Sequence, residues 1–110
     1  MTPRQPDVEL LWWAGCPSHP RALEQLRAAM TERGWDADAV VVREVADDAT
    51  AQRERFIGSP TIRIDGHDVA DDGGQLPALT CRVYRRRDGR FSPLPDPDDL
   101  RAALAAAETP

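Results

Sequence analysis

The sequence predicts a single α/β domain in which a mixed four-stranded sheet is covered by three helices. In the first half, apolar and β-branched runs alternate with helical patterns in the order β-α-β-α, which requires a parallel strand pair with a right-handed crossover. The second half adds two strands, one of which ends at the turn signal Asp65-Gly66, and a last helix. The complete predicted order is therefore β-α-β-α-β-β-α.

The length and the net charge of the chain indicate how many domains it forms and which kinds of partner are disfavoured. The 110 residues are enough for one core without disulfides or metals. We assign residues 1–6, which include two prolines, to a flexible N-terminal tail and residues 7–110 to the domain. The net charge of −5 argues against nucleic acid or an anionic membrane as the main partner. No long apolar run or secretory signal is visible, so we expect a cytoplasmic, reducing location with no structural disulfide.

The expected elements of the first half are a strand, a helix, a strand and a short helix, at 7–13, 20–33, 39–45 and 48–56. The first strand is apolar on both faces, which is typical of a central strand. In the first helix Leu23, Leu26 and Met30 follow helical spacing. Ser18 is a suitable N-cap for this helix, and Gly34 ends it.

The second half is expected to hold two strands, at 61–64 and 79–85, and a last helix capped by Asp96 with Pro97 at its first position. Residues 68–78 are expected to form a mobile loop. The arginines between residues 82 and 90 are interpreted as the solvated side chains of an edge strand, which discourage aggregation.

The most informative stretch surrounds Cys16. The strand ends at Ala14-Gly15, the cysteine follows at once, and a helix begins after Pro20. Unpaired N–H groups and the helix dipole favour an anion there, so this thiol is expected to ionise below the roughly 8.5 of a free cysteine. His19 is close enough in sequence to stabilise the thiolate, with a solvent-facing turn position as the alternative. Trp12 and Trp13 are expected to point to opposite faces of the strand. One fills the core, and the other, which we take to be Trp13, lines the cysteine site.

Two segments, LLWWAGCPSH and, about forty residues later, GSPTIRIDG, resemble the active-site regions of the thioredoxin-like superfamily in its short, glutaredoxin-like form. The resemblance implies that Cys16 is the nucleophile and that Pro60 forms a cis peptide bond beside it. It also implies that Ser59 leaves a backbone N–H and C=O free to pair with an extended substrate, with Ser59 and Thr61 contacting that substrate. His19 stands where the family has its second cysteine, so the local dithiol is missing.

The function implied by this resemblance is monothiol chemistry at Cys16, either thiol–disulfide exchange or adduct formation. The partner would be a protein or a low-molecular-weight thiol or disulfide, and no cofactor is called for. A thioredoxin-like binding module without turnover is the alternative from a different class, because a fold does not determine a function. The oligomeric state is left open.

A second segment, LTCRVY with Phe91 to Leu100 after it, is similar to the late cysteine strand and following helix of organomercurial lyases, which use two thiolates and a carboxylate. This similarity makes Cys81 a candidate second thiol. On its own Cys81 is interpreted as a core-facing strand residue. The thioredoxin-like order would place it two strands from Cys16, about 10 Å away, which disfavours a disulfide unless the loop at 68–78 shifts the register.

Two of the residues named above, Cys16 and His19, are also candidate metal ligands. Cys16 and His19 offer two ligands where structural zinc needs four, so no metal centre is expected. Transient capture of a soft ion such as Hg(II) or Cu(I) is left open.

Overall fold

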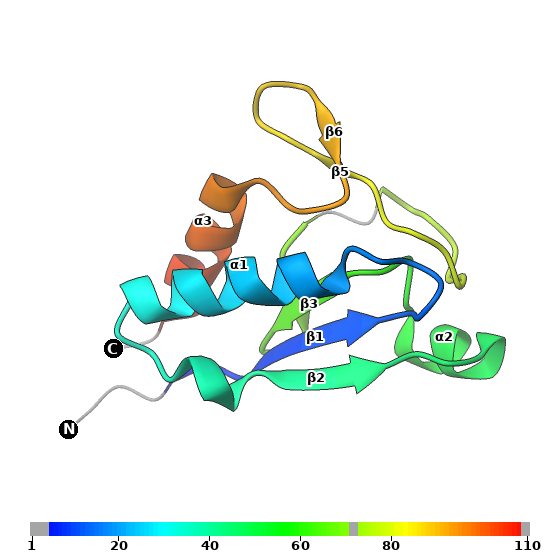
Figure 1. The fold of residues 1–110 in the computed structure, drawn as a ribbon, viewed down its shortest axis with the longest axis horizontal. Coiled ribbons are helices and arrows are strands. Elements are labelled where there is room, and N and C mark those ends of the chain that lie inside the picture. Colours follow the sequence, from blue (N-terminus) through cyan, green and yellow to red (C-terminus); the bar gives the residue numbers. More distant parts are fainter. Residues whose placement is uncertain (1–4, 71–72, 109–110) are drawn as a thin grey trace.

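The computed structural model describes residues 5–70 and 73–108, and within these residues the chain is an α/β domain with three α-helices and a mixed four-stranded sheet, as predicted. The elements are β1 (Val8–Trp12), α1 (His19–Glu32), the 3-10 turn η1 (Ala37–Ala39), β2 (Val41–Glu44), α2 (Asp48–Glu54), β3 (Thr61–Ile64), β4 (His67–Asp68), β5 (Tyr84–Arg85), β6 (Phe91–Ser92) and α3 (Pro97–Ala107) (Figure 1).

The four-stranded sheet has the order β2-β1-β3-β4. The β1–β2 pair is parallel and places Glu9 opposite Val41, whereas β3 runs antiparallel to both β1 and β4. The tight β3–β4 connection is made by Asp65 and Gly66, both with positive φ, as the turn signal predicts. Strand β1 is therefore central, and its carboxyl end carries the segment that leads to Cys16.

Helices cover both faces of the sheet, and the alternation of side chains along β1 separates the two cores. Leu10 joins the larger core with α1 and α3, whose contributions include Leu26 and Leu100. Leu11, the next residue, points to the other face and packs with Phe56. Figure 1 shows α1 and α3 on one side of the sheet, with α2 near the carboxyl ends of β1 and β2.

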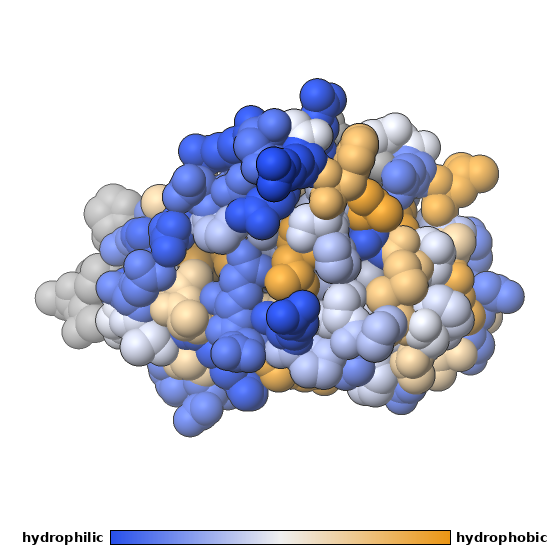
Figure 2. Space-filling view, turned by 45° about the horizontal axis from the view of Figure 1, so that its top comes forward, coloured by the Kyte–Doolittle hydropathy of each residue, from blue (hydrophilic) through white to orange (hydrophobic). Residues whose placement is uncertain are grey.

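The surface is divided along the long axis of the molecule. Figure 2 shows that hydrophilic residues dominate the end that holds the two termini, whereas apolar residues gather toward the opposite half. The most exposed large apolar side chains include Leu76, Val83 and Phe91, which are 84%, 62% and 72% exposed. None of the helices in the described ranges is long and apolar enough to cross a membrane.

The predicted fourth strand at 79–85 is wrong. The fourth strand of the sheet is β4, within the segment expected to be a loop, and residues 84–85 begin a separate hairpin with β6. The reason is that residues 80–82 turn back to form backbone hydrogen bonds with Ser59 instead of extending the sheet edge. No local signal in the sequence marks this long-range pairing.

Other boundaries differ by a few residues. Strand β2 starts later than predicted because the Asp36 side chain accepts a hydrogen bond from the Asp38 N–H and closes the turn η1. Helix α2 ends at Glu54 because Arg55 adopts the left-handed conformation. Of the predicted tail, residues 1–4 lie outside the described residues, while Gln5 exchanges two hydrogen bonds with Asp36. Residues 71–72 of the predicted mobile loop are likewise outside the described part.

Candidate functional site

The turn between β1 and α1 holds Cys16. The Cys16 N–H donates to the Trp13 carbonyl oxygen over 3.1 Å, which closes a tight turn. Gly15 is required there, because a Cβ atom at this position would lie 2.4 Å from two atoms of the Trp13 ring. Ser18 is the N-cap residue of α1, but its hydroxyl does not cap the helix. It lies 3.4 Å from the Cys16 Sγ instead.

Cys16 is buried, with only 2% of its surface exposed. Its Sγ donates to the Ser59 carbonyl oxygen over 3.5 Å and also contacts the Ser18 hydroxyl. The thiol thus lies between the first turn of α1 and the loop before β3, as the sequence predicts for a residue beside Pro60.

The loop before β3 is fixed by its own hydrogen bonds. The Ser59–Pro60 bond is cis. The Ser59 hydroxyl accepts from the Trp13 N–H over 3.0 Å, and the Thr61 hydroxyl donates to the Gly58 carbonyl oxygen over 2.7 Å. Ser59 and Thr61 are fully buried. Their predicted role as substrate contacts is therefore not available in this conformation, because both side chains are enclosed by the protein.

The backbone of Ser59 is also occupied, which corrects the expectation of a free edge for an extended substrate. The Ser59 N–H donates to the Thr80 carbonyl oxygen over 2.8 Å. The Ser59 carbonyl oxygen accepts from the Arg82 N–H over 2.8 Å. Between these two bonds, Ser59 and Cys81 form a parallel bridge. A segment of the chain itself, residues 80–82, takes the place that the resemblance assigns to a substrate.

Cys81 is consequently not where the sequence places it. The sequence predicts that it faces the core about two strands from Cys16, but it is exposed, and it pairs with Ser59, whose carbonyl oxygen accepts from the Cys16 thiol, so the two cysteines are neighbours. The predicted separation of the two sulfurs depends on a fourth strand at 79–85, which does not form. The structure therefore brings together the two cysteines of the chain, both as free thiols.

Arg82 anchors this arrangement, and its burial corrects the expectation that it is solvated. The residue is only 4% exposed. Its guanidinium donates to Asp68 Oδ2 over 2.7 Å, to the Thr61 hydroxyl over 3.3 Å and to the Ala70 carbonyl oxygen over 3.4 Å. A buried charge needs such partners, so this network ties residues 80–82 to β3 and β4.

Tyr84 adds a second anchor. The Arg82 guanidinium lies 4.5 Å from the centre of the Tyr84 ring, and the buried Tyr84 hydroxyl donates to the Pro60 carbonyl oxygen. Burial raises the pKa of Tyr84 well above its ordinary value, so it remains a hydrogen-bond donor. Sequence reasoning missed both anchors. The alternation Arg82-Val83-Tyr84 puts Arg82 and Tyr84 on one face of an extended segment, but it does not indicate that this face, and not the face of the exposed Val83, is buried.

The two thiols have opposite tendencies to ionise. Burial by itself would raise the pKa of Cys16, but hydrogen bonds from the Cys81 thiol and from Ser18 outweigh it, so the pKa lies below its ordinary value. The pKa of Cys81 is raised, chiefly by its hydrogen bond to Cys16, and further by burial and by the negative charge on Cys16. In the ionised pair, Cys16 carries the charge and Cys81 donates the hydrogen bond.

His19 and the tryptophans occupy the other side of the turn. The His19 ring stacks on Trp12 with 4.2 Å between ring centres, and its Nδ1 lies 3.5 Å from the Cys16 carbonyl oxygen. The contacts of the Cys16 sulfur come instead from Ser18, Ser59 and Cys81. Trp13 is half-buried and packs against the core on the α2 side of the sheet.

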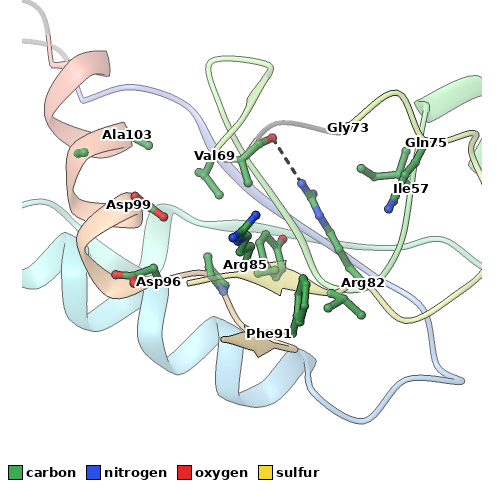
Figure 3. A pocket seen from close by; sticks show the side chains of 15 residues that line it. Ile57, Val69, Gly73, Gln75, Arg82, Arg85, Phe91, Asp96, Asp99 and Ala103 are labelled. Carbon is green, nitrogen blue, oxygen red and sulfur yellow. Dashed lines mark hydrogen bonds between the residues drawn. The ribbon is translucent and has the colours of Figure 1, made fainter. Parts of the chain in front are cut away.

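A hollow of about 660 Å³ lies beside this region, between the β5–β6 hairpin, α3 and the residues Val69, Ala70, Gly73 and Gln75. Figure 3 shows Arg82, Arg85 and Phe91 on one side of it and Asp96 and Asp99 of α3 on the other. Neither cysteine lines it. Among residues 5–70 and 73–108, no group of three or more His, Cys, Asp or Glu side chains is arranged to hold a metal ion.

Comparison of the chain with protein-family models, with curated proteins and with solved structures finds no match.

Proposed function

We propose that this protein is a thioredoxin-like thiol protein that carries out thiol–disulfide exchange, with Cys16 as its reactive thiolate. Three features of the fold support the proposal: the mixed sheet β2-β1-β3-β4 with its three helices, the position of Cys16 between β1 and α1, and the cis bond before Pro60. The proposal departs from the monothiol form expected from the sequence, because Cys81 supplies a second thiol.

The observation that carries the proposal is that both cysteines adjoin Ser59: the Cys16 thiol donates to its carbonyl oxygen, and Cys81 pairs with its backbone. Two thiols that can form a disulfide with one another allow exchange to end in release of the partner without attack by a further external thiol. The motif Cys16-Pro17-Ser18-His19 lacks a second cysteine. Cys81, which is far away in the sequence but pairs with Ser59, supplies a second thiol instead. We assign activation of Cys16 to Ser18 and Cys81, whose hydrogen bonds reach its sulfur, and not to His19.

A reducing, cytoplasmic location belongs to this proposal. A pair that works by exchange must return to the dithiol form, and the cytosolic thiol pool maintains that form.

The test is catalysis of exchange between reduced glutathione and a small dialkyl disulfide. The wild-type protein is expected to accelerate the exchange by about tenfold or more over a single ordinary cysteine, because the second thiol is held in place. Cys16→Ser should remove the acceleration. The matched control is the variant Cys16→Ser/Cys81→Ser/Ala105→Cys, which carries one exposed cysteine on α3. Wild-type activity no higher than that of this control would contradict the proposal.

The same arrangement of the two cysteines favours a second candidate, capture of a soft ion or an organomercurial as substrate. Two adjacent thiolates suit ions such as Hg(II) and Cu(I). The similarity of the Cys81 segment to organomercurial lyases points the same way. The third group of that family, a carboxylate, has no counterpart grouped with both thiols in the described ranges. The test is release of Hg(II) from an organomercurial, with Cys16 and Cys81 each replaced by serine; release that survives both replacements would reject this candidate.

A further inference from the structure

The two cysteines differ sharply in access. Cys16 is 2% exposed and enclosed by Ser18 and Ser59, whereas Cys81 is exposed to solvent. Exchange requires a thiolate to reach a sulfur atom directly, so access decides which sulfur of a pair is attacked. In this pair the outer sulfur belongs to Cys81 and the inner one to Cys16.

The backbone at the site restricts the kind of partner. An extended polypeptide would bind beside the cis bond through the N–H and C=O of Ser59, but Thr80 and Arg82 already use both groups. Arg82 is held in turn by Asp68 and Tyr84, so the segment that covers Ser59 is firmly anchored. A small thiol needs no such backbone pairing and can approach the exposed sulfur alone.

We propose that a low-molecular-weight thiol joins the protein at Cys81, and that Cys16 is the internal thiol that is released and later resolves the mixed disulfide. This inference rests on the proposed function and reverses the roles that the resemblance implies, in which Cys16 itself would carry the partner.

In the oxidised protein, the thiolate of the small thiol attacks the Cys81 sulfur, the Cys16–Cys81 bond breaks, and Cys16 leaves as a thiolate. A second molecule of the small thiol attacks the sulfur of the first, which releases Cys81 and a small disulfide. Two thiols are oxidised and the protein disulfide is reduced to a dithiol. In reverse, Cys16 attacks the Cys81 mixed disulfide and expels the small thiolate, which takes a proton from water.

The electrostatics of the pair agree with these roles. The hydrogen bonds from Ser18 lower the pKa of Cys16 and do not depend on the Cys81 proton, so they remain when Cys81 carries the small thiol. They favour Cys16 as the leaving group, since a thiol of lower pKa departs faster. Cys81 keeps its proton in the reduced pair because of its bond to Cys16. The accessible sulfur and the favoured leaving group are thus different atoms.

The experiment uses the wild-type protein after oxidation with diamide. Reduced glutathione is added for a short time, the reaction is stopped with excess iodoacetamide, and peptides are mapped by mass spectrometry. We expect glutathione on Cys81 and alkylation on Cys16, with about tenfold more of this product than of the reverse. A cysteine-containing ten-residue peptide should react more slowly than glutathione, by about tenfold, because Ser59 is covered.

Other results would contradict either the inference alone or the proposed function as well. Glutathione found mainly on Cys16, or a peptide that reacts as fast as glutathione, would reject the inference while leaving the proposed function in place. Failure of diamide to link the two cysteines would reject the inference as well. Loss of all acceleration of exchange relative to the control with Ala105→Cys would reject the proposed function, and the inference with it.

Discussion

Gly58 is the position where the contact between the loop before β3 and residues 80–82 is most easily tested. Its φ is +146°, a conformation that residues with a side chain rarely adopt. A Cβ atom there would lie 2.9 Å from both Cα and Cβ of Arg82 and 3.0 Å from its nitrogen. Gly58→Ala is therefore expected to separate Cys81 from Cys16 without changing either cysteine.

The size of the effect follows from two contributions. Ordinary contacts begin at 3.4 Å, so the new methyl group overlaps with backbone atoms that have no side-chain freedom to move away. Holding a non-glycine residue in such a conformation costs about 1–3 kcal/mol. Separation of the segments instead loses the two hydrogen bonds of Ser59, at about 1 kcal/mol each. We expect the free energy of unfolding to fall by about 2–4 kcal/mol.

Urea unfolding under reducing conditions measures this change, and a drop of about 1–2 M in the midpoint is expected. The control is Gly34→Ala, because Gly34 also has positive φ but no atom within 4 Å of the added methyl group. In the same samples, the rate at which diamide links the two cysteines should fall only for Gly58→Ala. An effect of Gly58→Ala no larger than that of Gly34→Ala, with disulfide formation unchanged, would refute the reasoning.

Three further predictions concern the surroundings of the pair. Tyr84→Phe removes the bond from its hydroxyl to the carbonyl of the cis proline and should lower the free energy of unfolding by about 1–3 kcal/mol in urea. Gly15→Ala should displace the Trp13 ring, 2.4 Å from the new methyl group, and change the tryptophan fluorescence of the folded protein; an unchanged spectrum would contradict the packing. Because the pKa of Cys16 is lowered and that of Cys81 raised, the free energy of unfolding should rise with pH toward about 8.5 and fall above it. Urea unfolding across pH, with the double serine variant lacking this maximum, checks the last prediction.

The first half of the fold could be predicted because its signals are local. The apolar run of β1, the spacing of Leu23, Leu26 and Met30, and the Asp65-Gly66 turn each specify structure within a few residues. The same holds for the position of Cys16, which depends on a strand that ends directly before a helix.

The arrangement of Cys81 could not be predicted because it depends on partners far apart in the sequence. Arg82 is buried only because Asp68, Thr61 and Tyr84 surround it, and residues 80–82 pair with Ser59 rather than with a sheet edge. A run of arginines is ordinarily solvated, so local reasoning favoured an exposed edge strand. The misplaced strand then carried Cys81 away from Cys16 in the expected topology.

The most direct test is a titration of thiolate absorbance in the ultraviolet for the reduced wild-type protein and for the variants Cys16→Ser and Cys81→Ala. We expect that the wild type shows a first ionisation below about 8.5, that Cys16→Ser loses it, and that Cys81→Ala, which removes the donor at position 81, moves the ionisation of Cys16 upward. Gly34→Ala, far from the pair, should leave the curve unchanged. A wild-type protein in which both thiols ionise at the ordinary value, or a low ionisation that persists in Cys16→Ser, would contradict the assignment of Cys16 as the activated thiolate of a Cys16–Cys81 pair.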